Sequence, residues 1–355
     1  MGRVQFGFYV ATARKGPFEV TEQAVEAEKR GFDSFWFSDH LIDDNIDLLH
    51  GETWASLAFA ATRTKKIKLA SGVTDPFRRH PSVTAQTVAT LDHISSGRAV
   101  LGLGAGEAMN LVPFGIDFEA PVQRLRESIV VIRKLWQASN KEPASFNGNV
   151  FTLKDAFVQI VPVQKPSPPI YVGALSKKTR ELTGELADGW LPWINSPKSY
   201  KERLRDVERG AAKSGRSLRD LDLVATLDVA ISDDREEARQ ATLLSGKAAL
   251  ILERGLLREM GYHVSLPEST SIRTGIFTRE TAKLLEEAVS LVPDEAVHQI
   301  SAFGTADDCK SKIEQFIKAG AKHVLIVNQG PDQKETLKAI SSEIIPYLRE
   351  TYSDL

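Results

Sequence analysis

The sequence predicts an α/β fold, a (β/α)8 barrel of the TIM type with insertions. Eight short apolar runs have strand character, helical patterns stand between most of them, and polar or glycine-rich residues directly follow several runs. With 355 residues the chain is long enough, because such a barrel typically uses about 250 residues as one domain. We therefore expect a single barrel domain over 1–355, with an open, doubly wound sheet as the alternative.

The first half of the chain alternates regularly between strand and helix patterns. Apolar runs predict strands at 4–10, 34–37, 67–70 and 99–103. Helical periodicity predicts helices at 19–30, 52–64, 81–94 and 121–138. Gly31 follows the first of these helices and Pro81 opens the third, as is typical of a helix end and a helix start.

The second half continues the alternation but carries two longer inserts. Further strands are predicted at 170–172, 189–193, 221–231 and 321–328, and further helices at 177–186 and 334–350. Residues 140–168 hold an Asn-Gly pair between short β-like runs, which predicts a hairpin. Residues 253–300 are expected to form extra helices before the last strand.

Composition and charge exclude several classes of function. The net charge is −2 and the pI is about 6.4, so nothing favours a nucleic-acid partner. No apolar stretch approaches the roughly 18 residues of a membrane helix, so no membrane partner is expected. A single cysteine, Cys309, rules out a disulfide framework; we interpret it as a small apolar filler in a cytoplasmic protein. Zinc-protease, CxxC and P-loop patterns are absent, and no metal site is predicted.

Candidate functional residues follow the strands, because the active site of a (β/α)8 barrel lies at the C-terminal strand ends. Asp39 and His40 come directly after the second run, and histidine titrates near neutrality, which suits proton transfer. A histidine in a surface loop beside a helix-capping aspartate is the alternative.

The segment GLGAGEAMN at 102–110 follows the fourth run and places Glu107 after three glycines. The spacing does not fit the dinucleotide pattern G-x-G-x-x-G, because Glu107 stands where the third glycine would be needed. We interpret the loop as the mount of a general acid, Glu107, at the barrel mouth. A first-turn carboxylate favoured by a helix dipole is the alternative.

Two basic segments are candidates for anion binding. Lys177 and Lys178 open a helix directly after Gly173-Ala174-Leu175-Ser176, and the N-terminus of a helix can bind a phosphate through its N–H groups. Arg78 and Arg79 form the second segment. For both, a solvated basic stretch at the start of a helix is the alternative.

Together these strand-end motifs resemble a known group, the bacterial-luciferase-like superfamily. The matching pieces are SDH at 38–40, SGVTDPFRRHP at 71–81, TLDHISSGRAVLGLGAGEAMN at 90–110 and GALSKKTRELTGELADGW at 173–190. They are most similar to the branch that uses coenzyme F420, an 8-hydroxy-5-deazaflavin. That branch includes glucose-6-phosphate dehydrogenases, secondary alcohol dehydrogenases and methylenetetrahydromethanopterin reductases.

The resemblance implies a luciferase-like barrel with F420 in its mouth. It implies that Asp39 contacts the ring or its neighbouring loop, and that the stretch from Ser71 contains a non-prolyl cis peptide near Gly72. The cofactor-binding residues that it implies are Asp39, Ser71, Gly72, Val73, Thr74, Gly106, Glu107, Asn110, Gly173, Ala174 and Leu175. Among these, the 71–74 group would support the ring, the 106–110 group would line the ring or ribityl chain, and the 173–175 group would hold the phosphate.

The activity that the resemblance implies is hydride transfer between C5 of F420 and a small organic substrate. That substrate would be methylenetetrahydromethanopterin or an alcohol or carbonyl compound, with His40 and Glu107 handling the proton. An FMN-dependent monooxygenase of the same superfamily and a non-catalytic flavin-binding barrel are the alternatives. Analogy with the family also leads us to expect a homodimer.

Overall fold

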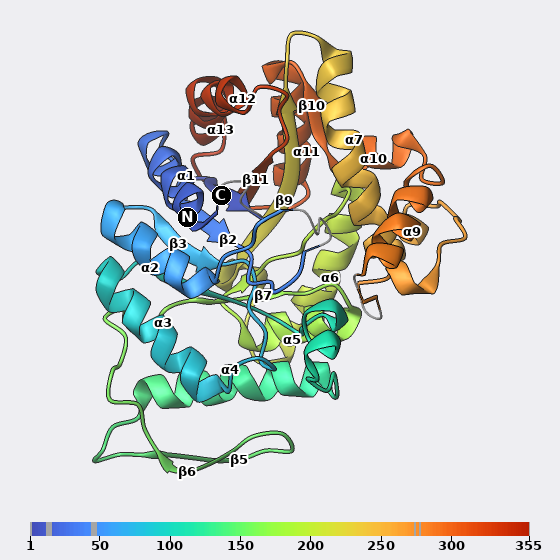
Figure 1. Ribbon diagram of the computed structural model, residues 1–355. Coiled ribbons are helices and arrows are strands. Elements are labelled where there is room, and N and C mark those ends of the chain that lie inside the picture. The colour runs from blue at the N-terminus through green and yellow to red at the C-terminus, as the bar shows by residue number, and fades with distance from the viewer. Residues whose placement is uncertain (1, 12–15, 44–47, 273–274, 277, 355) are drawn as a thin grey trace.

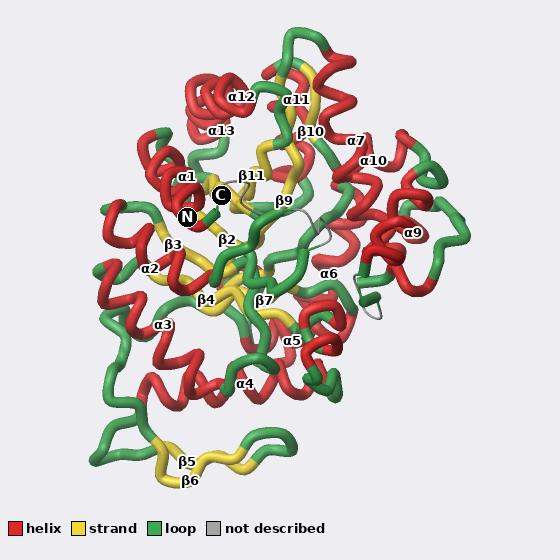
Figure 2. Tube along the Cα trace, viewed as in Figure 1, coloured by secondary structure: helices red, strands yellow, loops and turns green. Residues whose placement is uncertain are grey.

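The centre of the structure is a closed barrel of eight parallel strands surrounded by helices (Figures 1 and 2). The computed structural model describes residues 2–11, 16–43, 48–272, 275–276 and 278–354. The barrel strands are β1 (Gln5–Val10), β2 (Ser34–Phe37), β3 (Lys68–Ser71), β4 (Ala99–Gly104), β7 (Ile170–Gly173), β8 (Gly189–Trp190), β9 (Asp222–Ile231) and β11 (His323–Asn328). They pair in the order β9-β11-β1-β2-β3-β4-β7-β8, and β8 pairs again with β9. The predicted barrel is therefore confirmed, and the open sheet is wrong.

One predicted strand is shorter than expected, and one observed strand was not predicted. The sixth strand was predicted at 189–193, but only Gly189 and Trp190 pair as a strand. Leu191 still donates its N–H to Val172, but Pro192 has no N–H to continue the ladder, so the chain turns into the mouth. A ninth parallel strand, β10 (Ala302–Gly304), pairs with the end of β9 and was not predicted, because three residues carry no periodicity.

Helices cover the outside of the barrel (Figure 2). They are α1 (Pro17–Lys29), α2 (Thr53–Arg63), α3 (Pro81–Ser95), α4 (Pro121–Gln137), α5 (Lys177–Leu186), α6 (Pro197–Lys213), α7 (Arg235–Leu252), α11 (Ala306–Lys318), α12 (Gln333–Ala339) and α13 (Ile345–Thr351). The sequence prediction omitted α6, α7 and α11, and the single closing helix predicted at 334–350 is divided by a π-helical turn at Ile340–Ile344. In the described part of the chain, no helix combines the length and apolar character needed to cross a bilayer.

The first insert is the predicted hairpin, which lies beside α4 at the bottom of Figure 1. Its strands are β5 (Ala144–Asn147) and β6 (Thr152–Ala156), with four residues between them rather than a two-residue Asn-Gly turn. The buried Glu127 of α4 explains the wider turn. Its carboxylate accepts the N–H groups of Asn149, Val150 and Phe151 at 2.8, 2.9 and 2.9 Å.

Replacing Glu127 with glutamine is expected to lower the free energy of unfolding by about 1.5–3 kcal/mol, because an amide replaces a charged acceptor of backbone N–H groups. Burial disfavours the ionised form of Glu127, but the hydrogen bonds from Gln123 and the three N–H groups outweigh burial and lower the pKa of Glu127. Urea unfolding measures the change, and Glu142→Gln, an exposed change in the same insert, is the control. Equal stability of both variants would contradict the role of Glu127.

The second insert is helical, as predicted. It contains α8 (Arg254–Glu259), a 3-10 turn at Glu268–Thr270, α9 (Arg279–Val289) and α10 (Asp294–Ile300). Together with the C-terminal end of α7, these elements build a separate small hydrophobic cluster that also contains Met109. Trp193 and Ile194 of the mouth pack against this cluster, so the insert forms one wall beside the barrel opening.

The N-terminal end of the barrel interior is filled by a hydrogen-bonded chain of side chains, which we call the interior plug: Ser34, Trp36, Tyr171, Asp222 and His323. Ser34 joins the Trp36 indole at 2.8 Å to the His323 ring at 2.9 Å. Asp222 accepts hydrogen bonds from His323 Nδ1 at 2.9 Å and from the Tyr171 hydroxyl at 2.6 Å. A Ser-His-Asp arrangement usually suggests a nucleophile, but Ser34 and His323 are each only 1% exposed. The interior plug is therefore a packing element, in which every member has a partner.

Candidate active site

The C-terminal strand ends open into a cavity of about 1250 Å³. Most of the predicted site residues line it: Asp39, His40, Gly72, Val73, Thr74, Gly106, Glu107, Asn110, Gly173 and Leu175. Ser71 and Ala174 lie behind this wall, where they are 0% and 1% exposed. The cavity thus brings together residues from distant parts of the sequence, as expected for the strand ends of a barrel.

His40 stands between two carboxylates. Its Nδ1 donates to Asp43 Oδ2 at 3.1 Å, and its Nε2 lies 3.5 Å from Glu107 Oε2. Burial favours the uncharged ring, but Glu107 and Asp43 outweigh it and raise the pKa of His40 to about 9. At neutral pH both ring nitrogens therefore carry a proton and the ring is positively charged. Asp43 holds Nδ1, so that Nε2 faces the carboxylate of Glu107.

Asn110 fixes this arrangement by joining two loops. Its Oδ1 accepts the N–H groups of Leu41 and Ile42 at 2.6 and 3.0 Å, and its Nδ2 donates to Glu107 at 3.2 Å. Asn110 is only 2% exposed. Its amide is bonded to these two loops, and a small part of the residue lines the cavity. The geometry makes Asn110 a positioning residue for the pair of His40 and Glu107.

His50 packs against the face of His40. The ring centroids are 5.7 Å apart, and Phe37 also stacks on His50, with the centroids 5.0 Å apart. Burial and the charge on His40 lower the pKa of His50. Among the described residues, His40, Asp43 and His50 bring ligand-type atoms within 4.8 Å of one another. Each already has a hydrogen-bonding partner, and we assign no metal to them.

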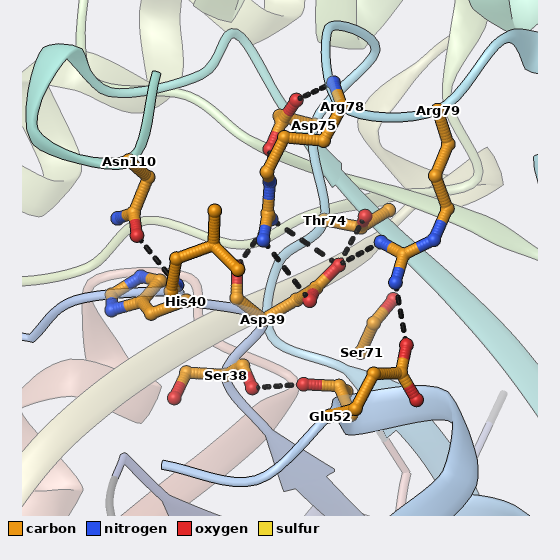
Figure 3. Close-up of polar contacts among 12 residues, drawn as sticks. Ser38, Asp39, His40, Glu52, Ser71, Thr74, Asp75, Arg78, Arg79 and Asn110 are labelled. Atoms are coloured by element: carbon orange, nitrogen blue, oxygen red, sulfur yellow. Dashed lines mark hydrogen bonds and ion pairs between the residues drawn. The ribbon is translucent and has the colours of Figure 1, made fainter. Parts of the chain in front are cut away.

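Asp39 lies in a buried cluster of charges rather than pointing into open space (Figure 3). Its Oδ2 accepts from Thr74 Oγ1 at 2.5 Å and from Arg79 at 3.0 Å, and it lies 3.3 Å from Arg78 Nη2. Arg78 also binds Asp75, and Arg79 also binds Glu52, each at 2.5 Å. The two arginines are therefore already paired, and in this structure they connect the loop after β2 to the loop after β3.

The stretch after β3 forms the floor of the cavity. The peptide bond between Gly72 and Val73 is cis, as the resemblance implied. Tyr9 donates its hydroxyl to the Gly72 carbonyl at 2.6 Å, and Ser71 bonds to the backbone of Gly102. A Cβ at Gly104 or Gly173 would lie 2.7 or 3.1 Å from a methyl group of Val73, so these glycines make room for it.

The turn from Gly173 to Ser176 leads into α5, whose N-terminus faces the same cavity. The Ser176 hydroxyl accepts the N–H of Thr179, which leaves the first N–H groups of the helix for another acceptor. Arg180, paired with Asp206 at 2.7 Å, donates to the Leu175 carbonyl and holds the turn. Lys177 and Lys178 lie exposed at the start of the helix.

Sequence reasoning missed two features of the site. Asp43, the partner of His40, could have been found from its position three residues after the histidine. The pairing of Arg78 and Arg79 with Asp39 could not, because it joins side chains about forty residues apart and depends on how two loops meet.

Comparison with known proteins decides the family. The model of the luciferase-like monooxygenase family matches residues 4–323. The chain belongs to this luciferase-like family. A 5,10-methylenetetrahydromethanopterin reductase of Archaeoglobus fulgidus is 32% identical to this luciferase-like chain over 339 residues, covering 94% of the chain and 96% of that protein. An F420-dependent glucose-6-phosphate dehydrogenase of Microbacterium testaceum is 31% identical over 359 residues, covering 99% of each.

Two solved structures resemble the chain over nearly its whole length. The coenzyme F420-dependent tetrahydromethanopterin reductase of Methanopyrus kandleri superimposes with a TM-score of 0.82 at 28% identity, covering 98% of this chain and 99% of that one. An F420-dependent secondary alcohol dehydrogenase in complex with an F420-acetone adduct gives 0.81 at 26% identity, with the same coverage.

Proposed function

We propose that this protein is an F420-dependent oxidoreductase, which moves a hydride between the coenzyme and a carbon atom of a small organic substrate. The observation that carries the proposal is the half-buried pair of His40 and Glu107, 3.5 Å apart, in the cavity that also contains the glycine-rich floor. Relatives covering nearly the whole chain are named F420-dependent dehydrogenases and reductases.

The residues of the cavity fit a flat ring with a phosphate-bearing chain. Gly104 and Gly173 leave the Val73 side chain room to form a smooth floor, and Thr74 and Asp39 hold that floor in place. The turn at Gly173–Leu175 and the N-terminus of α5 would hold the phosphate. When bound, F420 supplies or accepts the hydride at C5, which is chemistry that no amino-acid side chain provides.

The protein itself supplies the proton transfer. His40 Nε2 is the atom that gives or takes the proton, because Nδ1 is held by Asp43. Glu107 stabilises the charged ring and lies close enough to receive its proton. Asn110 bonds to both loops and so holds His40 and Glu107 in their relative positions.

The rate of carbonyl reduction is expected to be nearly constant from about pH 6 to 8 and to fall above about pH 9. A reduction consumes a proton, which we assign to the charged His40 ring. Because the pKa of His40 is raised to about 9, the ring keeps this proton below pH 9 and loses it above pH 9. Oxidation of the alcohol should show the opposite trend and increase toward pH 9. Profiles of kcat/KM in both directions measure this, and a midpoint near 6.5 would contradict the effect of the two carboxylates.

We infer methylenetetrahydromethanopterin or an alcohol or carbonyl compound as the substrate, since relatives named for both kinds of chemistry cover almost the entire chain. The second candidate function is an FMN-dependent monooxygenase, whose solved examples share the fold at lower identity. Titration with F420 and with FMN distinguishes them. Tight binding of FMN without binding of F420, accompanied by oxygen uptake, would overturn the proposal.

We also infer a cytoplasmic homodimer. The Phe18 ring, 72% exposed, packs edge-on against the exposed Phe59, and we take this apolar pair as a candidate contact for the partner copy. Sedimentation velocity of the purified protein measures the oligomeric state.

A further inference from the structure

Asp228 is a carboxylate in the mouth that the proposed chemistry does not use. It lies on β9, where alternate residues face the barrel interior: Asp222 in the interior plug, Val224 in the central layer, then Thr226 and Asp228. Thr226 and Asp228 both line the active-site cavity. Asp228 is half-buried, so its carboxyl group is open to a molecule bound there.

The local partners of Asp228 leave its carboxylate incompletely satisfied. Ser245 of α7 donates to Oδ2 at 2.9 Å, and the Gln329 amide lies 3.5 Å from Oδ1. In the described part of the chain, no lysine or arginine forms an ion pair with it. Burial raises the pKa of Asp228, and the two polar neighbours only partly oppose this.

An ionised carboxylate has about four acceptor positions, and two are used here, one of them at long range. The remaining capacity faces the cavity. A neutral carbonyl or an anion brought to this position would gain nothing from it, whereas a hydroxyl or ammonium group would donate a charge-assisted hydrogen bond.

We propose that Asp228, oriented by Ser245 and Gln329, determines substrate specificity by accepting a hydrogen bond from a hydroxyl or amine group that the substrate carries beside its reacting carbon. This inference rests on the proposed function and narrows its substrate class. The reacting carbon of the substrate would then lie toward His40 and its donor group toward Asp228, in the cavity that both residues line.

The test uses the enzyme loaded with reduced F420, which cannot oxidise an alcohol. Dissociation constants of 2-propanol, 1,2-propanediol and 1-amino-2-propanol are measured by ligand-observed NMR. The diol or the amino alcohol is expected to bind about tenfold more tightly than 2-propanol, the effect of one hydrogen bond to a charged group. Asp228→Asn should abolish this preference. Asp233→Asn, the same change at an exposed position after the same strand, should keep it.

Each outcome separates the two levels of inference. Failure of reduced F420 to bind the wild-type protein overturns the proposed function. Coenzyme binding without a preference in the wild type, or with a preference that persists in Asp228→Asn, overturns only the assignment of Asp228. If Asp228→Asn does not fold, Ser245→Ala decides: a weaker preference supports the orienting role of Ser245, and an unchanged one contradicts it.

Discussion

Replacing His40 with alanine is expected to lower kcat by about 100- to 10,000-fold, the usual contribution of a positioned acid–base group, with the affinity for F420 changed only a few-fold. The imidazole lies between Asp43 and Glu107, and without it the cavity keeps its floor but has no proton donor at that position. Steady-state turnover and fluorescence titration of F420 measure the two quantities separately.

His263→Ala is the matched control, since this histidine is exposed on the surface. It should retain wild-type turnover. A His40→Ala variant that turns over within tenfold of the wild type would remove the acid–base assignment. A variant that no longer binds F420 would show instead that His40 supports the binding site, and the proton donor would have to be sought elsewhere.

The second large effect is expected at Asp39. Its replacement by alanine should lower the free energy of unfolding by about 3–5 kcal/mol, because breaking a buried ion pair is strongly destabilising. Arg78 would keep only Asp75, and Arg79 would keep only the exposed Glu52. Asp39 is 3% exposed and serves both Arg78 and Arg79 as well as Thr74. Since these contacts connect the loops after β2 and β3, F420 affinity should fall in the same variant.

Urea unfolding followed by circular dichroism measures the stability change at Asp39. Asp117→Ala, at an exposed position, is the control and should change stability by less than about 0.5 kcal/mol. A loss below about 1 kcal/mol for Asp39→Ala would mean that Asp75 and Glu52, the other carboxylates bound to Arg78 and Arg79, neutralise the cluster without Asp39.

Most of the fold was predictable because the apolar pattern of a strand or helix can be read from residues that are neighbours in the sequence. The apolar runs at β1, β2, β4 and β9 fall within one or two residues of the strands observed. What escaped prediction depended on partners distant in sequence. β10 is a strand only because the end of β9 offers it a free edge, and β8 ends early because Pro192 follows. The wide hairpin turn depends on Glu127, a residue of another element.

The site shows the same division. The strand-end rule located His40 and Glu107, and the resemblance implied a cis bond near Gly72. The contribution of Asn110 could not be read from its type, because the amide is satisfied by backbone groups of residues 41 and 42. Asp228 escaped because only the barrel shows which face of β9 points inward.

The interior plug has a kinetic consequence for this barrel. Because Ser34, Asp222 and His323 fill its N-terminal end, molecules reach the reacting centre through the mouth. A substrate bound on top of a coenzyme that lies on the floor formed by Val73 would then stand between that coenzyme and the solvent. We therefore expect product to leave before the coenzyme exchanges, so that an excess of substrate slows that exchange and the mechanism is ordered, with the coenzyme first on and last off.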